Sequence, residues 1–321
     1  MYTIESLQSL VAKAIVDYSA KNNTDSLQEP IHYLLGLGGK RMRPALTLLA
    51  TDLFGGDVPS ALPAAMSIEV FHNFTLMHDD IMDNAPLRRG NVTVHEKWNT
   101  NTAILSGDAM LIEAYQLLCG YSGSQIKQIL PLFNDTALGV CKGQQMDMEF
   151  EKRSDVSVEE YIEMIRLKTA VLLGGALEIG GIIANATAPD LEHIRLFGEK
   201  LGISFQLRDD YLDAFGDPEN FGKQVGGDIL SDKKTYLYLT AIARCDAHQK
   251  AVFDQWHGNT DMAKIEEIKS IMIATGADQA ILDVSQQYYE EALNHLDRIN
   301  VTDDRKATLR ALAAHLLHRE V

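Results

Sequence analysis

The chain has 321 residues, of which 46% are hydrophobic, and 45 acidic against 29 basic residues leave a formal charge of −16. Such a chain can build one large core or two ordinary domains. The acidic balance argues against nucleic acid or an anionic membrane surface as the main partner, because both need a basic face. No apolar run reaches the length of about 18 residues that a membrane span needs, so none is predicted.

The three cysteines, Cys119, Cys141 and Cys245, show no CxxC spacing. They lie in helix-like segments, which indicates reduced, buried thiols and not a disulfide or zinc framework. The first residues lack a basic stretch followed by an apolar core, so no export signal is predicted. Together these features predict a cytoplasmic location.

Apolar residues recur with a period near 3.6, and the prolines stand almost wholly at likely boundaries, so the predicted fold class is all-α. Pro44 is predicted to open a helix, Ser60 to cap another, and Ser157 with Glu160 to form a capping box. The predicted helices cover residues 3–21, a segment ending at 36–39, 44–53, a segment from 60 to the first acidic motif, 103–119, 124–151, 157–187, 190–215, 232–255, 261–274, 278–298 and 303–318.

No linker, low-complexity tract or block of charge marks a domain boundary. A single domain over residues 1–321 is therefore predicted, as a bundle of ten or more helices around a central cavity. Two loops stand out between the helices: a basic loop at 88–90 and a glycine-rich loop at 221–228.

Two short acidic motifs share one spacing: residues 79–83 are Asp-Asp-Ile-Met-Asp, and residues 209–213 are Asp-Asp-Tyr-Leu-Asp. On a helix the first and last carboxylates lie one turn apart on one face, where they repel unless a cation lies between them. Mg²⁺ suits this set, because it takes few carboxylates and completes its shell with water and phosphate oxygens. Composition alone would produce roughly one such window, whereas two all-aspartate copies predict a pair of facing metal clusters.

Cations near these motifs could share the charge of a diphosphate group, although a surface lysine is more often only solvated. The first candidate set is Arg88, Lys168, Lys223 and Lys233. A second set could bind another anion without metal, since arginine forks match phosphate oxygens. This set is Lys40, Arg43 and Arg89. Two different diphosphate sites suit a two-substrate reaction in which a metal-bound diphosphate is the leaving group.

Departure of the metal-bound diphosphate leaves a carbocation, which needs a dry apolar pocket. The apolar residues between Ile68 and Met77 supply candidates for its wall, although each fits a core-facing helix position equally well. His72 lies seven residues before Asp79, two helical turns back on the same face. A ligand that reaches both side chains is therefore geometrically plausible.

These motifs together resemble the trans-isoprenyl diphosphate synthases, or polyprenyl synthetases. The resemblance spans residues 36–240, with the motifs in family order: 38–44, 69–83, 88–90, 168–169, 205–213, 222–223 and Lys233. It implies an isoprenoid synthase fold and head-to-tail condensation of isopentenyl diphosphate with allylic diphosphates. It also implies a homodimer and Mg²⁺ ions, three per site with substrate bound.

The resemblance assigns roles to individual residues. The metal ligands would be Asp79, Asp80, Asp83, Asp209, Asp210 and Asp213. The allylic diphosphate would contact Arg88, Lys168, Gln206, Lys223 and Lys233. Isopentenyl diphosphate would lie on Gly39, Lys40, Arg43, His72 and Arg89, with Phe205 close to its alkene. Catalysis would involve Asp79, Asp83, Asp209, Lys168, Thr169 and Gln206, while Gln144 and Asp147 match another family motif.

Product length in this family depends on bulky residues four or five positions before the first aspartate, here Thr75 and Phe74. The absence of a two-residue insertion in the motif resembles archaeal-type C20 synthases and favours C15 or C20 products, farnesyl or geranylgeranyl diphosphate. An ideal helix places Thr75 about 40° and Phe74 about 140° from Asp79, which favours Thr75 as the pocket floor. The resemblance favours Phe74, with Phe71 one turn behind it.

Three other functions fit part of the pattern. A class I terpene cyclase ionises one allylic diphosphate without a second substrate, so the second cationic set argues against it. A non-catalytic subunit of a synthase need not keep both acidic motifs, and this chain has both. A purely metal-binding helical scaffold would leave the glycine-rich loop and the basic turn without a role.

Overall fold

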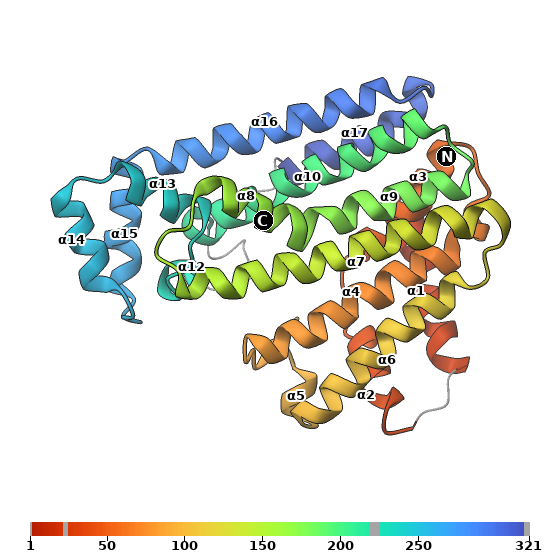
Figure 1. Cartoon of the computed structure of the whole chain (residues 1–321), viewed down its shortest axis with the longest axis horizontal. Helices are drawn as coiled ribbons and strands as arrows, with labels where there is room; N and C mark the ends of the chain where they lie inside the picture. The colour runs from red at the N-terminus through yellow and green to blue at the C-terminus, as the bar shows by residue number, and fades with distance from the viewer. Residues whose placement is uncertain (1, 22–24, 218–224, 318–321) are drawn as a thin grey trace. The chain divides into compact units, whose positions relative to one another are not determined.

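The computed structural model describes residues 2–21, 25–217 and 225–317. Throughout these ranges the chain forms helices joined by loops, as Figure 1 shows, together with one two-stranded hairpin. The all-α prediction is confirmed. No helix within these ranges is long and apolar enough to cross a membrane.

Contacts between residues divide the chain into two compact units. The first unit consists of residues 1–134, 175–195 and 300–305, and the second of residues 135–174, 196–299 and 306–321. Each unit carries one aspartate motif. The single domain expected from the sequence stays a prediction, and so does the expectation that the two motifs face each other.

The first unit is built around one central helix, α4 (Leu62–Met82), which packs against α1, α3 and α6. Its other helices are α1 (Ile4–Lys21), α2 (Gln28–Gly36), α3 (Met42–Leu53), the 3-10 turn η1 (Val58–Ala61), α5 (Val94–Lys97) and α6 (Thr100–Leu118). Three helices have one part in each unit: α7 (Gly123–Lys152), α9 (Val171–Ile183) and α10 (Ala188–Phe215). Most of α4 before the aspartate motif is buried, and its buried residues include polar ones such as Ser67, Glu69 and Asn73 beside the apolar majority.

The second unit has its own apolar core, which includes Phe150, Leu207, Leu237, Ile268 and Ile281. Its elements are α8 (Val158–Ile165), the π-helical segment η2 (Arg166–Ala170), α12 (Gly227–Leu230), α13 (Tyr236–Arg244), α14 (Ala247–Trp256), α15 (Ala263–Ala274), α16 (Ala277–Arg298) and most of α17 (Asp303–Leu317). Figure 1 shows α12 to α15 as a run of short helices, of which α13 and α15 pack against the long α16.

Three expectations about helix boundaries were wrong. Ser60 does not cap α4; it lies inside η1, where Asp57 accepts from the Ser60 backbone N–H. The single helix expected over 232–255 is two helices, α13 and α14, because Thr235 and Asp246 each cap a new start. The helix expected over 157–187 begins at the predicted capping box but contains the π segment η2.

The cysteines only partly match the sequence-based expectation. All three are free thiols, as predicted. Cys119 and Cys141 are exposed, however, and Cys245 is half-buried, so the expectation of buried thiols was wrong. Helical periodicity locates a residue on a helix but does not by itself decide which face another helix covers.

Candidate active site

The first aspartate motif occupies the C-terminal end of α4, with Asp83 as the C-cap residue. The last turn of this helix contains no basic residue. A helix C-terminus carries a partial negative charge, so three carboxylates at this position are unfavourable unless a cation compensates them. The second motif repeats the arrangement near the end of α10, whose last turn also lacks a basic residue.

A short β-hairpin follows the first motif. Its strands are β1 (Leu87–Arg88) and β2 (Asn91–Val92), and the two turn residues, Arg89 and Gly90, have φ values of 55° and 75°. Positive φ at both positions is typical of a type I′ turn, whose twist matches that of the strands. Arg88 lies on β1 and Arg89 in the turn, and their side chains reach different partners: Arg88 contacts Asp80, and Arg89 donates to the Gly38 carbonyl oxygen.

Arg88 pairs with the first aspartate motif. Its Nη2 and Nε lie 2.5 and 2.9 Å from Oδ1 of Asp80, and its Nη2 lies 3.5 Å from Oδ2 of Asp79. Asp80 is only 2% exposed. Burial raises the pKa of the Asp80 carboxyl, and the hydrogen bond from Arg88 opposes that rise. Arg88 thus holds Asp80 within the fold, while the Asp83 side chain is exposed.

Arg43 and Arg89 lie near His72 in the first unit. Arg43 Nη1 lies 3.2 Å from His72 Nε2, and Arg89 donates to the carbonyl oxygen of Gly38. Burial and the positive charges of Arg43 and Arg89 lower the pKa of His72 well below its usual value, so the ring is neutral. Because arginine only donates, Nε2 must accept and Nδ1 carries the proton. The ring is thereby oriented within a cationic cluster.

The basic turn 38–43 is anchored from two sides. Arg41, with a left-handed φ of 46°, pairs with the buried Glu69 of α4, and Gln8 Nε2 of α1 donates to the Lys40 carbonyl at 2.5 Å. Gly39 and Lys40 line an open groove of about 610 Å³ beside α1. The anchors fix the backbone of the turn and leave the exposed Lys40 side chain to meet a ligand.

Asp210 of the second motif is at the centre of a hydrogen-bond chain. It is 6% exposed and accepts from the Tyr161 hydroxyl and, at 3.0 Å, from Gln206 Nε2. The Thr169 hydroxyl donates to Gln206 Oε1 at 3.3 Å, which orients the amide. Burial, followed by the charge of Asp228, raises the pKa of Asp210 well above its usual value. Asp210, like Asp80, is therefore held mainly by protein groups.

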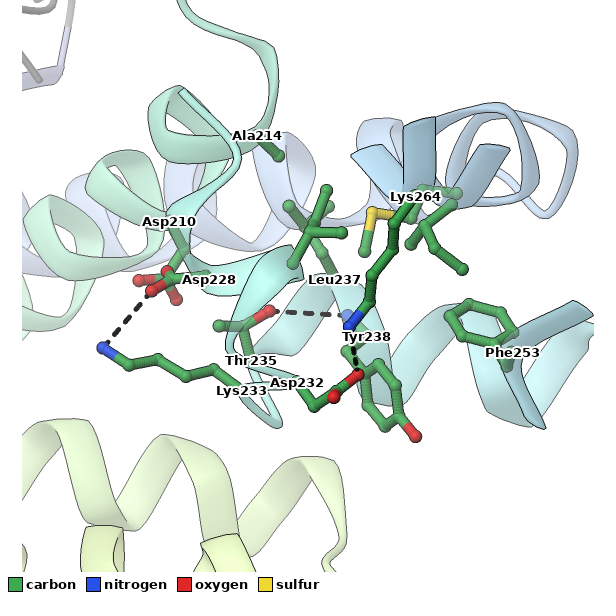
Figure 2. A pocket seen from close by; sticks show the side chains of 13 residues that line it. Asp210, Ala214, Asp228, Asp232, Lys233, Thr235, Leu237, Tyr238, Phe253 and Lys264 are labelled. Atoms are coloured by element: carbon green, nitrogen blue, oxygen red, sulfur yellow. Dashed lines mark hydrogen bonds and ion pairs between the residues drawn. The ribbon is translucent and has the colours of Figure 1, made fainter. Parts of the chain in front are cut away.

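Asp213 ties the second motif to the segment that follows the glycine-rich loop. Its Oδ2 accepts from the Asp228 N–H at 2.9 Å. Lys233 Nζ lies 3.3 Å from Asp228 Oδ1, and its side chain is 57% exposed. Figure 2 shows Asp210, Asp228 and Lys233 at one end of a small pocket, whose volume is about 20 Å³.

Lys168 and Thr169 both lie in the π segment η2. Lys168 Nζ is 2.5 Å from Asp147 Oδ2 of α7. Lys168 therefore contacts the family motif that contains Gln144 and Asp147. π segments are rare and often mark functional sites, because the extra residue per turn redirects side chains. Here the segment turns Thr169 toward Gln206 on α10.

An aromatic group surrounds the candidate length-determining residues. The Phe74 ring centroid lies 5.6 Å from that of Phe71 and 4.9 Å from that of His78. Phe71 packs in turn on Phe133 of α7, with centroids 5.4 Å apart. Thr75 is half-buried, and its hydroxyl donates to a carbonyl of its own helix at 2.7 Å.

The donor chemistry of both motifs fits Mg²⁺. Among the described residues no group of three or more His, Cys, Asp or Glu side chains is arranged to hold a metal by itself. Mg²⁺ does not need such a group, since it keeps several waters and takes its remaining ligands from substrate phosphates. Carboxylates at two helix C-termini, with no basic residue in the last turn of either helix, suit this type of binding.

Most predicted site residues make contacts within the unit to which they belong. Contacts join Arg43 to His72 and Arg88 to Asp80 in the first unit, and Thr169 to Gln206 in the second. Phe205 lies half-buried on α10. Lys223 lies outside the described residues.

The sequence reading missed three buried or partly buried partners. Tyr161 lies in an ordinary helical pattern that does not mark it, and Glu69 opens the 69–83 motif but had no role assigned to it. Asp228 stands in the glycine-rich stretch, where an acidic residue after two glycines was a visible but unused signal. All three contact residues that the motifs had identified.

Comparison with known proteins identifies the family. The family model described as polyprenyl synthetase matches residues 24–274. The geranylgeranyl diphosphate synthase of Saccharolobus solfataricus is 38% identical over 88% of this chain and 87% of its own length. A crystal structure of a geranylgeranyl pyrophosphate synthase shares 44% identity, covers 100% of both chains and superposes with a TM-score of 0.94.

A second solved structure carries ligands. It is the geranylgeranyl pyrophosphate synthase of Corynebacterium glutamicum complexed with isoprenyl diphosphate and magnesium. It is 29% identical to this chain, covers 98% of it and 97% of its own length, and has a TM-score of 0.85. These matches confirm the resemblance read from the motifs: the chain belongs to the polyprenyl synthetase family, and it is a prenyltransferase of the short-chain prenyl diphosphate synthase type.

Proposed function

We propose that the protein uses Mg²⁺ to condense isopentenyl diphosphate with allylic diphosphates, with geranylgeranyl diphosphate as the main product. The observation that supports this most is that each of two aspartate motifs ends a helix lacking basic residues in its last turn, with cations beside it. Carboxylates and cations so arranged suit a ligand that brings both metal ions and phosphate oxygens.

The allylic diphosphate would bind through Mg²⁺ to Asp79, Asp83, Asp209 and Asp213, with Asp80 and Asp210 holding the motifs in place. Contacts to its remaining oxygens would come from Arg88, Lys168, Gln206, Lys223 and Lys233. Bound Mg²⁺ would neutralise the charge that develops on the leaving diphosphate. Arg88 would then exchange its contact with Asp80 for a phosphate oxygen, which the flexible arginine stem permits.

Isopentenyl diphosphate would bind without metal at the basic turn and the hairpin. Arg43 and Arg89 would supply bidentate contacts, Lys40 and Gly39 would close the site, and the neutral His72 would donate through Nδ1. Phe205 would lie near the alkene. The terpene cyclase alternative has no use for this second anion site, because a cyclase takes one substrate.

The reaction itself breaks the C1–O bond of the allylic substrate and forms a bond from that carbon to C4 of isopentenyl diphosphate. A proton then leaves C2, and the released diphosphate is the proposed acceptor. The oxygens of Thr169 and Gln206 would lie near the developing cation and stabilise it electrostatically. Their mutual hydrogen bond keeps both in one orientation.

Incubation with isopentenyl diphosphate, Mg²⁺ and each of the C5, C10 and C15 allylic diphosphates tests the proposal directly. We expect elongation of all three, with a C20 product on extraction and mass analysis, and no turnover after chelation of Mg²⁺. A protein that cyclises an allylic diphosphate, or that shows no elongation with any starter, would refute it.

Truncation of Phe74 should lengthen the product. In Phe74→Ala the ring that packs on Phe71 and His78 is lost, so the pocket deepens by about one isoprene unit or more. Mass analysis of the products should show a shift from C20 toward C25 or longer. The matched comparison is Thr75→Ala: if only this variant lengthens the product, Thr75 and not Phe74 is the floor.

We also propose that the protein is a cytoplasmic homodimer. The three free thiols suit a reducing compartment. On α6, Ile104, Leu105 and Ile112 are exposed along one face, an apolar surface that a second copy could cover. Sedimentation equilibrium of the wild type against Leu105→Glu would show whether this face holds a dimer together.

A further inference from the structure

Helix α15 contains a buried lysine that the proposed chemistry does not use. Lys264 is 1% exposed. Its Nζ lies 2.7 Å from Asp232 Oδ1 and donates to the carbonyl oxygens of Leu230 and Asn259 at 3.3 and 3.2 Å. All three donors of the Lys264 ammonium are thus used, two by Leu230 and Asp232 just before Lys233 and one by Asn259.

The partner of Lys264 stands next to a proposed substrate contact. Asp232 has a left-handed φ of 53°, and the following residue is Lys233. Figure 2 shows the two side chains pointing in different directions, Asp232 toward Lys264 and Lys233 toward Asp228. The Gly258 N–H also donates to Asp232 Oδ2 at 2.8 Å, so both carboxylate oxygens are occupied.

Helix α15 contacts the same segment at a second point. Gly226 packs so closely on Ile265 that a Cβ at this glycine would lie 2.7 Å from the Ile265 Cδ1 atom. The segment from 226 to 233 is therefore held at both ends by neighbouring residues of one helix. On its other side it is held by Asp213, which accepts from the Asp228 N–H.

We propose that Lys264 and Asp232 form a positioning pair that aims Lys233 at the allylic diphosphate. The proposal rests on the function proposed above for Lys233. An exposed lysine side chain is flexible, so the direction in which it reaches depends on its backbone. The ion pair fixes that backbone one residue away, at Asp232, which has a left-handed conformation.

An ion pair whose lysine is buried and whose aspartate side chain is 22% exposed is suited to this task. Such a pair does not stabilise a fold more than apolar residues of similar size would, but its hydrogen bonds form only in a narrow range of positions of the two side chains. An apolar contact between α15 and the segment would tolerate small shifts. The pair therefore defines a single position for residues 232 and 233.

The test compares Lys264→Met with a matched loss of another buried lysine. Lys306 is 4% exposed, belongs to the same unit and donates to the carbonyl oxygen of Asp297 at 2.9 Å. We expect both methionine variants to unfold at lower temperature. Only Lys264→Met should bind inorganic diphosphate with Mg²⁺ about tenfold more weakly in calorimetry, as losses of supporting residues typically do. Its KM for the allylic substrate should rise equally, and its KM for isopentenyl diphosphate should not change.

A double-mutant cycle separates positioning from general damage. Because Lys264 acts through Lys233, Lys264→Met should have little further effect on diphosphate binding in a Lys233→Met background. If Lys264→Met fails to fold, the charge-neutral double variant Lys264→Met with Asp232→Asn replaces it, since asparagine tolerates the left-handed conformation and no isolated charge remains.

Equal diphosphate binding by the Lys264→Met and Lys306→Met variants, or additive losses in the cycle, would overturn the positioning role. A wild-type protein that makes no prenyl product would instead overturn the proposed function. The two failures are distinguishable because wild-type turnover is measured independently of the variants.

Discussion

Replacing Asp79 by alanine is expected to lower kcat roughly a thousandfold, because a carboxylate that holds Mg²⁺ contributes several kcal/mol to the transition state. The fold should tolerate the change. Asp79 lies at the C-terminal end of α4, where a negative charge opposes the helix dipole, and its side chain is 21% exposed. The midpoint of thermal unfolding should therefore stay the same or rise slightly.

The same substitution at Asp209 should have the same effect on turnover, since both motifs would hold ions on one diphosphate. The matched control is Asp108→Ala on α6, which removes a carboxylate that is 58% exposed and outside the proposed site. Initial rates with a C15 allylic diphosphate and thermal unfolding without substrate measure the two effects separately. Near-normal turnover in either Asp79→Ala or Asp209→Ala would refute the two-cluster mechanism.

Gly143→Ala is expected to destabilise the protein by about 3 kcal/mol and to reduce activity with it. A Cβ at this position on α7 would lie 2.2 Å from the backbone nitrogen of Lys168 and 2.6 Å from its Cα. Backbone atoms cannot rotate aside, so the π segment would have to move. Lys168 and Thr169 would move with it, away from Asp147 and Gln206.

The control for this variant lies one turn earlier on the same helix. A Cβ at Gly139 would meet only side chains, the nearest being Val171 Cγ2 at 3.3 Å. Alanine is the better helix former by about 1 kcal/mol, so Gly139→Ala should be neutral or stabilising. Urea unfolding curves of both variants test the difference. If Gly143→Ala is as stable and active as Gly139→Ala, the close approach of α7 to η2 is not required.

Local patterns in the sequence account for much of what the structure contains. The 3.6-residue period predicted an all-α fold, and the capping box at Ser157 marked a real helix start. The helix expected over 232–255 failed because periodicity continues across a break, while caps at Thr235 and Asp246 decide where helices begin. Capping signals were present there and carried more information than the apolar pattern.

The sequence also indicates the chemistry of the site. The site is built from short motifs: two aspartate motifs, a basic turn and an arginine pair. The chemistry of each motif depends on residues only a few positions apart, so the sequence alone can show it. The structure refines their members: Asp80 and Asp210 are buried and engaged by Arg88 and by Tyr161 with Gln206. These two carboxylates therefore support the motifs, which leaves the outer aspartates as the proposed ligands.

By itself, then, the sequence determined the fold class, the family and the residues that carry charge at the proposed site, since helical periodicity and motif spacing are local properties. Only the tertiary structure decided which residues hold them in place. Tyr161 is 49 positions from Asp210, and Lys264 is 32 from Asp232. Such partners meet only after the helices pack, because a buried hydrogen bond or ion pair needs the surrounding core to exclude water and fix its geometry.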